Sequence, residues 1–249
     1  MAKRKEEAGV TCSEAPPDSP CKRAALSSSA TAAPPPPTTI DLTAASARGE
    51  EGPRAGAMAA AAAERRGGEV VIGFYGHSPS KKYSEFSNFF WQRRPYDFVL
   101  PSFAQREGFQ GSVSCHFSEK AIMVSKAAMM NDRRVFHQML QCDSPSAVKA
   151  LGRKVSNFDN RLWTEHLEEL AFEVVRQKFE SDSEIAAVLL STGDATIAEA
   201  TRNDKIWGIG IDVGDPRVQD PKQWLGKNIL GTALMRTREH LRRSGGLAS

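Results

Sequence analysis

The chain has 249 residues, a formal net charge of +3 and four cysteines. The charge is spread along the chain without a stripe of Lys and Arg, which excludes an extended surface for a nucleic-acid backbone. The cysteines form no C-x-x-C pair and the histidines are dispersed, so we expect no disulfide framework, no metal and no cofactor. No apolar stretch approaches membrane-spanning length and no signal peptide is visible, so we expect no membrane partner and a cytoplasmic or nuclear location.

The composition divides the chain into a tail and a domain. Residues 1–67 are rich in Ala, Pro, Ser and Gly and contain no Phe, Tyr or Trp. Because such a segment cannot bury enough apolar area to offset the entropy of ordering, we predict that it is disordered. Its basic clusters, Lys3-Arg4-Lys5 and Lys22-Arg23, fit either a nuclear import signal or a solubilising tail. Residues 68–244 have the length of one domain with a single core, and residues 245–249 are expected to form a flexible C-terminus.

The first half of the domain shows short strands. Apolar residues from Val70 to Tyr75 indicate a buried strand, ended by Gly76 and Pro79. The aromatic segment 84–91 is turn-like. Two further strands are predicted, at residues 96–100 and 112–116, and a short segment at residues 196–200 is ambiguous.

Helical periodicity and capping residues predict the rest of the domain. Ser118 is placed to cap a helix, Asp132 and Ser144 to start the next two, and Asp159 to precede the longest. The predicted helices are 119–130, 132–140, 145–152, 162–179, 183–190 and 227–243. The fold class is therefore α+β and helix-rich, a single compact domain of about six or seven helices with a few short strands.

The predicted helix from Glu119 to Lys126 carries two opposite charges in an otherwise almost wholly apolar setting. Seven residues are two turns, so both charges point the same way, roughly 10 Å apart along the axis. A helix that is apolar all round is normally buried, and a buried charge costs several kcal/mol, as an order of magnitude, unless it is paired or faces a polar cavity. The two side chains therefore form the wall of an active site or pair with other charges in the core.

A second candidate is the glycine-rich loop from Asn203 to Gly210. Gly208 lets the backbone approach a ligand closely, and Trp207 beside it offers a flat face on which a nucleobase-like ring stacks. Asp204 supplies a second carboxylate. The alternative is an Asx-type turn with Trp207 as core filler. The glycine spacing matches neither a phosphate loop nor a dinucleotide fingerprint.

Two weaker candidates are Trp163 and the segment Gly226-Lys227-Asn228. Trp163 lies on the inward stripe of the longest predicted helix, which indicates core packing. The segment at the start of the last helix exposes backbone N–H groups that would receive an anionic group, or else it is a simple helix start with Asn228 bonding locally.

Taken together, these pieces resemble the NADAR family, also called the YbiA-like N-glycosidases. The matching motifs occur in family order and span residues 70–243, whereas the tail has no counterpart. They are Phe74-Tyr75, Phe86-Ser87-Asn88-Phe89, Ser118-Glu119 with Lys126, Leu151-Gly152-Arg153, Trp163, Lys178-Phe179, Asn203-Asp204 with Trp207-Gly208, Gly226-Lys227-Asn228, Leu230-Gly231 and Leu234-Met235.

The resemblance implies a small, mostly helical hydrolase that cuts C–N glycosidic bonds. The implied substrates are ribosylamino-pyrimidine intermediates of riboflavin synthesis or ADP-ribose attached to guanine, so the partner is a nucleotide-like small molecule or ADP-ribosylated nucleic acid. By resemblance, the catalytic residues are Glu119, Lys126 and Asp204, and the substrate-binding residues are Asn88, Trp163, Trp207, Gly208 and Asn228. The chain departs from the family at Met123, where relatives often have glutamine, and in a longer stretch between Gly210 and Gly226.

Two chemical routes fit these residues. Cleavage of a ribosyl C–N bond develops positive charge at the sugar carbon, which Glu119 or Asp204 would stabilise, or one of them would activate water. Alternatively, Lys126 would capture the opened sugar as an imine. A non-catalytic module that binds ADP-ribose would need the stacking residues but not Glu119, and an interaction protein with a degenerate domain would need neither. The oligomeric state is left open by the sequence.

Overall fold

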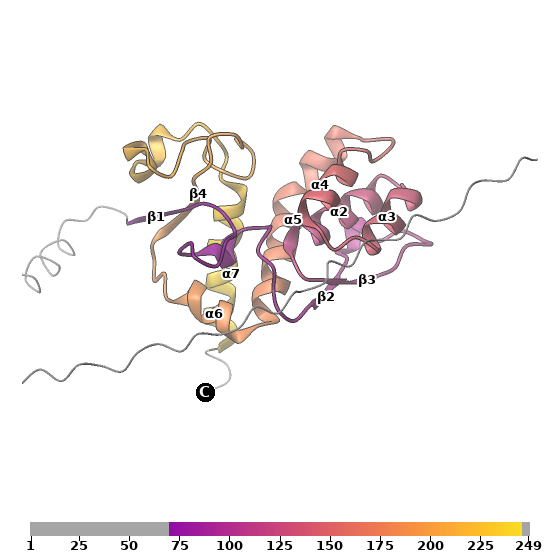
Figure 1. Cartoon of the computed structure of the whole chain (residues 1–249), viewed down its shortest axis with the longest axis horizontal. Coiled ribbons are helices and arrows are strands. Elements are labelled where there is room, and N and C mark those ends of the chain that lie inside the picture. The colour runs from indigo at the N-terminus through magenta and orange to yellow at the C-terminus, as the bar shows by residue number, and fades with distance from the viewer. Residues whose placement is uncertain (1–69, 246–249) are drawn as a thin grey trace, which may run out of the picture. The chain divides into compact units, whose positions relative to one another are not determined.

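The computed structural model describes residues 70–245 of the chain, so the predicted tail and the last four residues lie outside it. Helices predominate, and the strands are short (Figure 1). The strands are β1 (Val71–Phe74), β2 (Tyr96–Val99), β3 (Ser112–Cys115) and β4 (Thr196–Glu199). The helices are α2 (Ser118–Met129), α3 (Arg133–Leu140), α4 (Pro145–Gly152), α5 (Asn160–Glu180), α6 (Ser183–Leu190) and α7 (Ile229–Gly245). The predicted helix-rich α+β class is confirmed.

The four strands form two separate two-stranded sheets. β2 and β3 pair antiparallel, with Phe98 opposite Val113. β1 pairs in parallel with β4, with Val71 opposite Thr196 and Phe74 opposite Glu199. The segment that was ambiguous in the sequence is thus a strand, and its partner lies more than a hundred residues earlier in the chain.

Capping residues explain most helix starts. The Asp132 carboxylate accepts the Val135 N–H at the start of α3, and Asp159 and Asp182 cap α5 and α6 in the same way. The expectation for Ser118 is wrong, because Phe117 holds the capping position of α2 in an extended conformation and Ser118 is the first, buried residue of the helix. The second N–H of α2, from Glu119, is instead accepted by the backbone oxygen of Asn88 at 2.9 Å.

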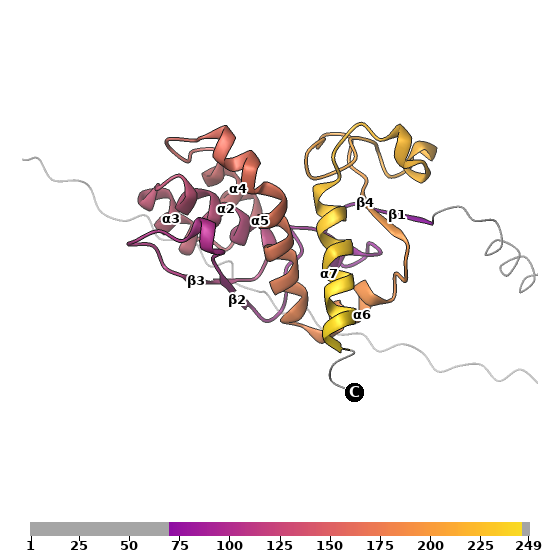
Figure 2. The same ribbon diagram turned by 180° about the vertical axis from the view of Figure 1, so that it is seen from behind.

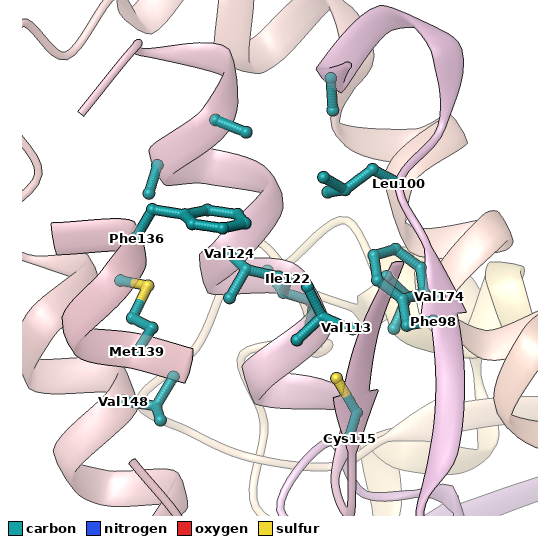
Figure 3. Close-up of a cluster of buried hydrophobic side chains, with 14 of the residues drawn as sticks. Phe98, Leu100, Val113, Cys115, Ile122, Val124, Phe136, Met139, Val148 and Val174 are labelled. Carbon is teal, nitrogen blue, oxygen red and sulfur yellow. The ribbon is translucent and has the colours of Figure 1, made fainter. Parts of the chain in front are cut away.

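Two large hydrophobic clusters hold the elements together. The first joins β2 and β3 to α2, α3 and α4, and Figure 3 shows its centre, where Phe98, Val113 and Ile122 meet. The second joins β1 and β4 to α5, α6 and α7. Helix α5 contributes to both, and it lies beside α7 (Figure 2). No helix within residues 70–245 is both long and apolar enough to cross a membrane.

Helix α7 packs against β4 so closely that one position accepts only glycine. A Cβ on Gly231 would overlap the backbone oxygen of Ile197 and the amide of Asn228. A Cβ on Gly245, at the other end of the same helix, would meet nothing within 4 Å.

We therefore expect Gly231→Ala to lower the free energy of unfolding by about 1–3 kcal/mol, as overpacking does. Gly245→Ala should cause no loss, since alanine is the better helix former at an open position. Urea unfolding of both variants checks this, and equal stabilities would show that α7 can move away from β4 at no cost.

Candidate active site

A cavity of about 270 Å³ lies at the junction of the two hydrophobic clusters. Five segments line it: the loop after Phe86, α2, α4, the end of β4 and the loop before α7. The lining residues are Ser87, Asn88, Phe89, Glu119, Met123, Lys149, Glu199, Asp204, Ile206 and Trp207. A wider outer cleft of about 1030 Å³ shares six of them, so the cavity opens into it.

Glu119 lies on the first turn of α2 with its side chain almost completely buried. Its Oε1 has no hydrogen-bond partner, and the Lys149 ammonium stands 3.9 Å away, which is an ion pair rather than a hydrogen bond. Burial raises the pKa of Glu119 to about 7, the charge of Lys149 opposes that rise, and the charge of Asp204 adds to it. The group thus titrates near neutral pH, where a carboxyl can both give and take a proton.

Glu199 is a functional candidate that the sequence analysis did not find. It ends β4, and its backbone is fixed on both sides: its N–H donates to Asn228 Oδ1 at 3.1 Å, and its carbonyl accepts the Ile209 N–H at 2.9 Å. Burial, together with the nearby charges of Asp204 and Glu119, raises the pKa of Glu199 to about 7, and the charge of Lys149 opposes that rise. The sequence signal for this candidate was a single glutamate that directly follows the uncharged segment Thr196–Ala198.

Asp204 and Trp207 satisfy both of the alternatives that the sequence left open. Asp204 Oδ1 accepts the N–H groups of Ile206 at 2.9 Å and Trp207 at 2.8 Å, so the segment is an Asx-type turn. Both side chains nevertheless line the cavity. The Trp207 ring packs against both hydrophobic clusters, which fixes its plane at the cavity wall.

The structure does not bring Lys126 to this cavity. Its ammonium donates to the backbone oxygen of Gly152 at 2.9 Å and lies 4.3 Å from the centre of the Phe158 ring. Lys126 leaves the helix one turn beyond Met123, which is the last residue of α2 to line the cavity. The expected meeting of Lys126 with the two acids is therefore wrong, and Lys149 of α4 is the amine beside Glu119.

Trp163 is likewise absent from the lining of the cavity. It packs against both hydrophobic clusters from α5, and the Lys126 ammonium lies 5.7 Å from its ring centre. Core packing, which its place on the helix stripe indicated, agrees with this position. The substrate-binding role drawn from the resemblance has no support in this geometry.

Asn228 and Gly208 do not line the cavity, but both contact β4, which carries Glu199. Asn228 is buried, and its amide holds the C-terminal half of β4 by donating to the Ile197 oxygen and accepting from the Glu199 N–H. A Cβ on Gly208 would lie 2.7 Å from the backbone oxygen of Glu199, so only glycine allows the loop to pass there. Their geometry indicates positioning rather than contact with a ligand.

The expected anion site at the start of α7 is closed. The N–H groups of Lys227, Asn228 and Ile229 donate to backbone oxygens of Lys205, Gly208 and Ile206, respectively. These bonds tie the helix start to the loop that carries Asp204. The other alternative, a helix start with Asn228 bonding locally, is also wrong, because the Asn228 side chain bonds to Ile197 and Glu199 of β4.

The family model for the NADAR domain matches residues 73–242. The chain belongs to the NADAR domain family. It is 37% identical over 122 residues to "N-glycosidase R617" of Acanthamoeba polyphaga mimivirus, which covers 49% of this chain and 72% of that protein. It is 30% identical over 173 residues to "N-glycosidase YbiA" of Shigella flexneri serotype 5b, covering 70% of this chain and 89% of that protein. The solved structure of the E. coli protein YbiA matches with a TM-score of 0.53 at 28% identity, covering 71% of this chain and 88% of that chain.

Lys178 is a second residue of this NADAR domain whose role only the structure shows. Its side chain is fully buried on α5 and donates to the backbone oxygens of Glu85 at 2.6 Å and Ser87 at 3.0 Å. Burial lowers the pKa of Lys178 to about 7. The ammonium holds the loop whose next residue, Asn88, lines the cavity and caps α2.

We expect Glu119→Gln to stabilise the protein above pH 7 and to leave its stability unchanged near pH 4. A glutamate whose folded pKa lies above its unfolded value stabilises below the unfolded pKa, and this contribution is lost as the pH rises to the folded pKa of about 7. Glutamine has no such loss, so the gain at pH 8 should reach a few kcal/mol at most.

Thermal unfolding between pH 4 and pH 8 measures this difference. Glu239→Gln, at an exposed position of α7, is the matched control and should follow the wild type at every pH. A Glu119→Gln curve parallel to that of the wild type would contradict the buried, proton-binding state of Glu119.

Proposed function

We propose that this NADAR domain is an N-glycosidase that hydrolyses the ribosyl C–N bond of a nucleotide-like substrate. The observation that carries the proposal is the convergence of Glu119, Glu199 and Asp204 with the face of Trp207 on one cavity. Carboxyl groups stabilise or transfer charge as the sugar carbon becomes positive, and the indole offers a stacking surface for the departing base. The names of the two N-glycosidase relatives support the same reaction class.

The charge of the outer cleft supports a substrate with phosphate groups. Five cations from three separate segments line it: Lys81, Lys149, Arg153, Arg202 and Lys205. Arg and Lys are the side chains that bind phosphate oxygens best, and the acids of the inner cavity remain next to the bond that breaks. The cleft also carries Tyr75, whose exposed ring offers a second flat face. Both classes of implied substrate, a phosphorylated ribosylamino-pyrimidine and ADP-ribosylated guanine, carry phosphate groups and an aromatic base.

Direct attack by water is the route that the geometry favours. The Glu119 side chain lines the cavity, and a carboxylate in that position can accept a proton from water. Lys126, the expected imine-forming residue, is held at Gly152 outside the cavity lining. Met123 fills the wall between them where relatives often have glutamine.

We expect Glu119→Gln to lower the turnover number by about 10²-fold or more, with the dissociation constant changed only a few-fold. Glutamine keeps the shape of the side chain but cannot take a proton. Chromatography of the released base from ADP-ribosylated guanosine and from a phosphorylated ribosylamino-pyrimidine measures turnover, and calorimetry measures binding. Glu239→Gln should keep full activity. Binding of these compounds by the wild type without any release of base would favour a non-catalytic module instead.

Borohydride reduction during turnover separates the two chemical routes. We expect no sugar adduct on Lys126 by peptide mass spectrometry, because its ammonium lies outside the cavity. An adduct on Lys126 would contradict direct attack by water and restore the imine route. An adduct on Lys149 would equally establish an imine, formed by the amine beside Glu119.

A further inference from the structure

The two glutamates of the cavity differ in their electrostatic partners. Glu119 has the Lys149 ammonium 3.9 Å from its Oε1, and a neighbouring cation stabilises the ionised carboxylate. No Lys or Arg of the described residues forms an ion pair with Glu199. Glu199 Oε2 and Glu119 Oε1 are both shielded from solvent and both lack a hydrogen-bond partner, so the ion pair with Lys149 is what distinguishes the two carboxyls. Ionising a shielded carboxyl without a paired cation is the costlier of the two, so Glu199 is the side chain of the pair that keeps its proton.

The surroundings of Glu199 strengthen this asymmetry. The charged groups that act on it are Asp204 from the loop before α7, Glu119 from α2 and Lys149 from α4. The two anions favour the neutral form of Glu199, and Lys149 opposes them, but Lys149 is already paired with Glu119. Asp204 is held in place by the two N–H groups that it accepts, so its negative charge stays at the cavity. Burial raises the pKa of both Glu199 and Glu119 to about 7, so the ion pair of Lys149 with Glu119, and not the pKa, assigns the two roles.

The backbone of Glu199 is fixed as a proton donor requires. Three hydrogen bonds hold it: its N–H donates to Asn228, and its carbonyl accepts from Thr201 and Ile209. The side chain lines both the inner cavity and the outer cleft, where the cations gather. A substrate with its phosphates in the outer cleft and its base in the cavity would pass this residue at the bond between them.

We propose that Glu199 is the general acid that protonates the departing base, opposite Glu119 as the general base; this assignment rests on the proposed function. The C–N bond breaks with its electron pair going to nitrogen, which takes the proton of the Glu199 carboxyl. Water forms the new bond to the sugar carbon and gives its proton to Glu119. Transfer of that proton through solvent from Glu119 to Glu199 returns the enzyme to its starting state.

The test compares two leaving groups in Glu199→Gln. The amino nitrogen of a ribosylamino-pyrimidine departs poorly as an anion and needs the proton, whereas nicotinamide departs from a pyridinium riboside as a neutral molecule and needs none. We expect Glu199→Gln to lower the turnover of the ribosylamino-pyrimidine by about 10²–10⁴-fold, which is the usual contribution of a general acid. The turnover of the pyridinium riboside should change less than about 5-fold. Glu119→Gln should slow both, because each needs activated water.

Further measurements separate an acid from a structural part. Glu199→Asp keeps a proton on a shorter arm and should recover part of the lost turnover. The wild-type rate should fall on the alkaline side of the pKa of about 7, and this fall should vanish in Glu199→Gln. Circular dichroism should show both variants folded, since Glu199 Oε2 accepts no hydrogen bond that either substitution would break.

Each contrary result has its own meaning. Equal loss on both leaving groups in Glu199→Gln, or no recovery in Glu199→Asp, would overturn the acid assignment and leave the proposed function standing. Absence of any release of base by the wild-type protein from either substrate would overturn both together.

Discussion

The burial of two carboxyl groups beside a third is the constraint on which the site depends. Glu119 and Glu199 line one cavity, where burial and the charge of Asp204 raise the proton affinity of both. An arrangement of this kind opposes folding, because each group would be better solvated in the unfolded chain. It persists only if the surrounding backbone is held firmly enough that the carboxyls cannot move apart or turn outward.

The scaffold meets this requirement with backbone hydrogen bonds from segments far apart in the chain. Asn88 accepts the Glu119 N–H, Lys178 holds the loop that carries Asn88, and Asn228 pins β4 at Glu199. Glycines then let these segments approach: Gly231 lets α7 pack on β4, and Gly208 lets the Asp204 loop pass behind Glu199. Asn228 and Gly208, which the sequence analysis gave as substrate-binding residues, therefore position the residues that line the cavity.

The sequence predicted what depends on neighbouring residues and missed what depends on distant ones. Helix starts at Asp132 and Asp159 follow from a local cap, and the Asp204–Trp207 turn follows from a spacing of three residues. Glu199 was missed because the strand that it ends is defined by pairing with β1, which no local pattern shows. Lys126 was misplaced because helical spacing gives the face of a helix but not the element opposite, and here α4 ends across from Lys126 and draws its ammonium to Gly152. Lys149 could be chosen only once α4 was placed against α2.

The position of a single cation decides how the two glutamates divide their work. Two equivalent buried carboxyls would share one proton, and neither would be a dependable acid or base. Lys149 removes that equivalence because it stands beside Glu119 and because Glu199 has no ion-pair partner among residues 70–245. The same ammonium lines the outer cleft, so an anionic substrate that binds there would draw on the charge that keeps Glu119 ionised.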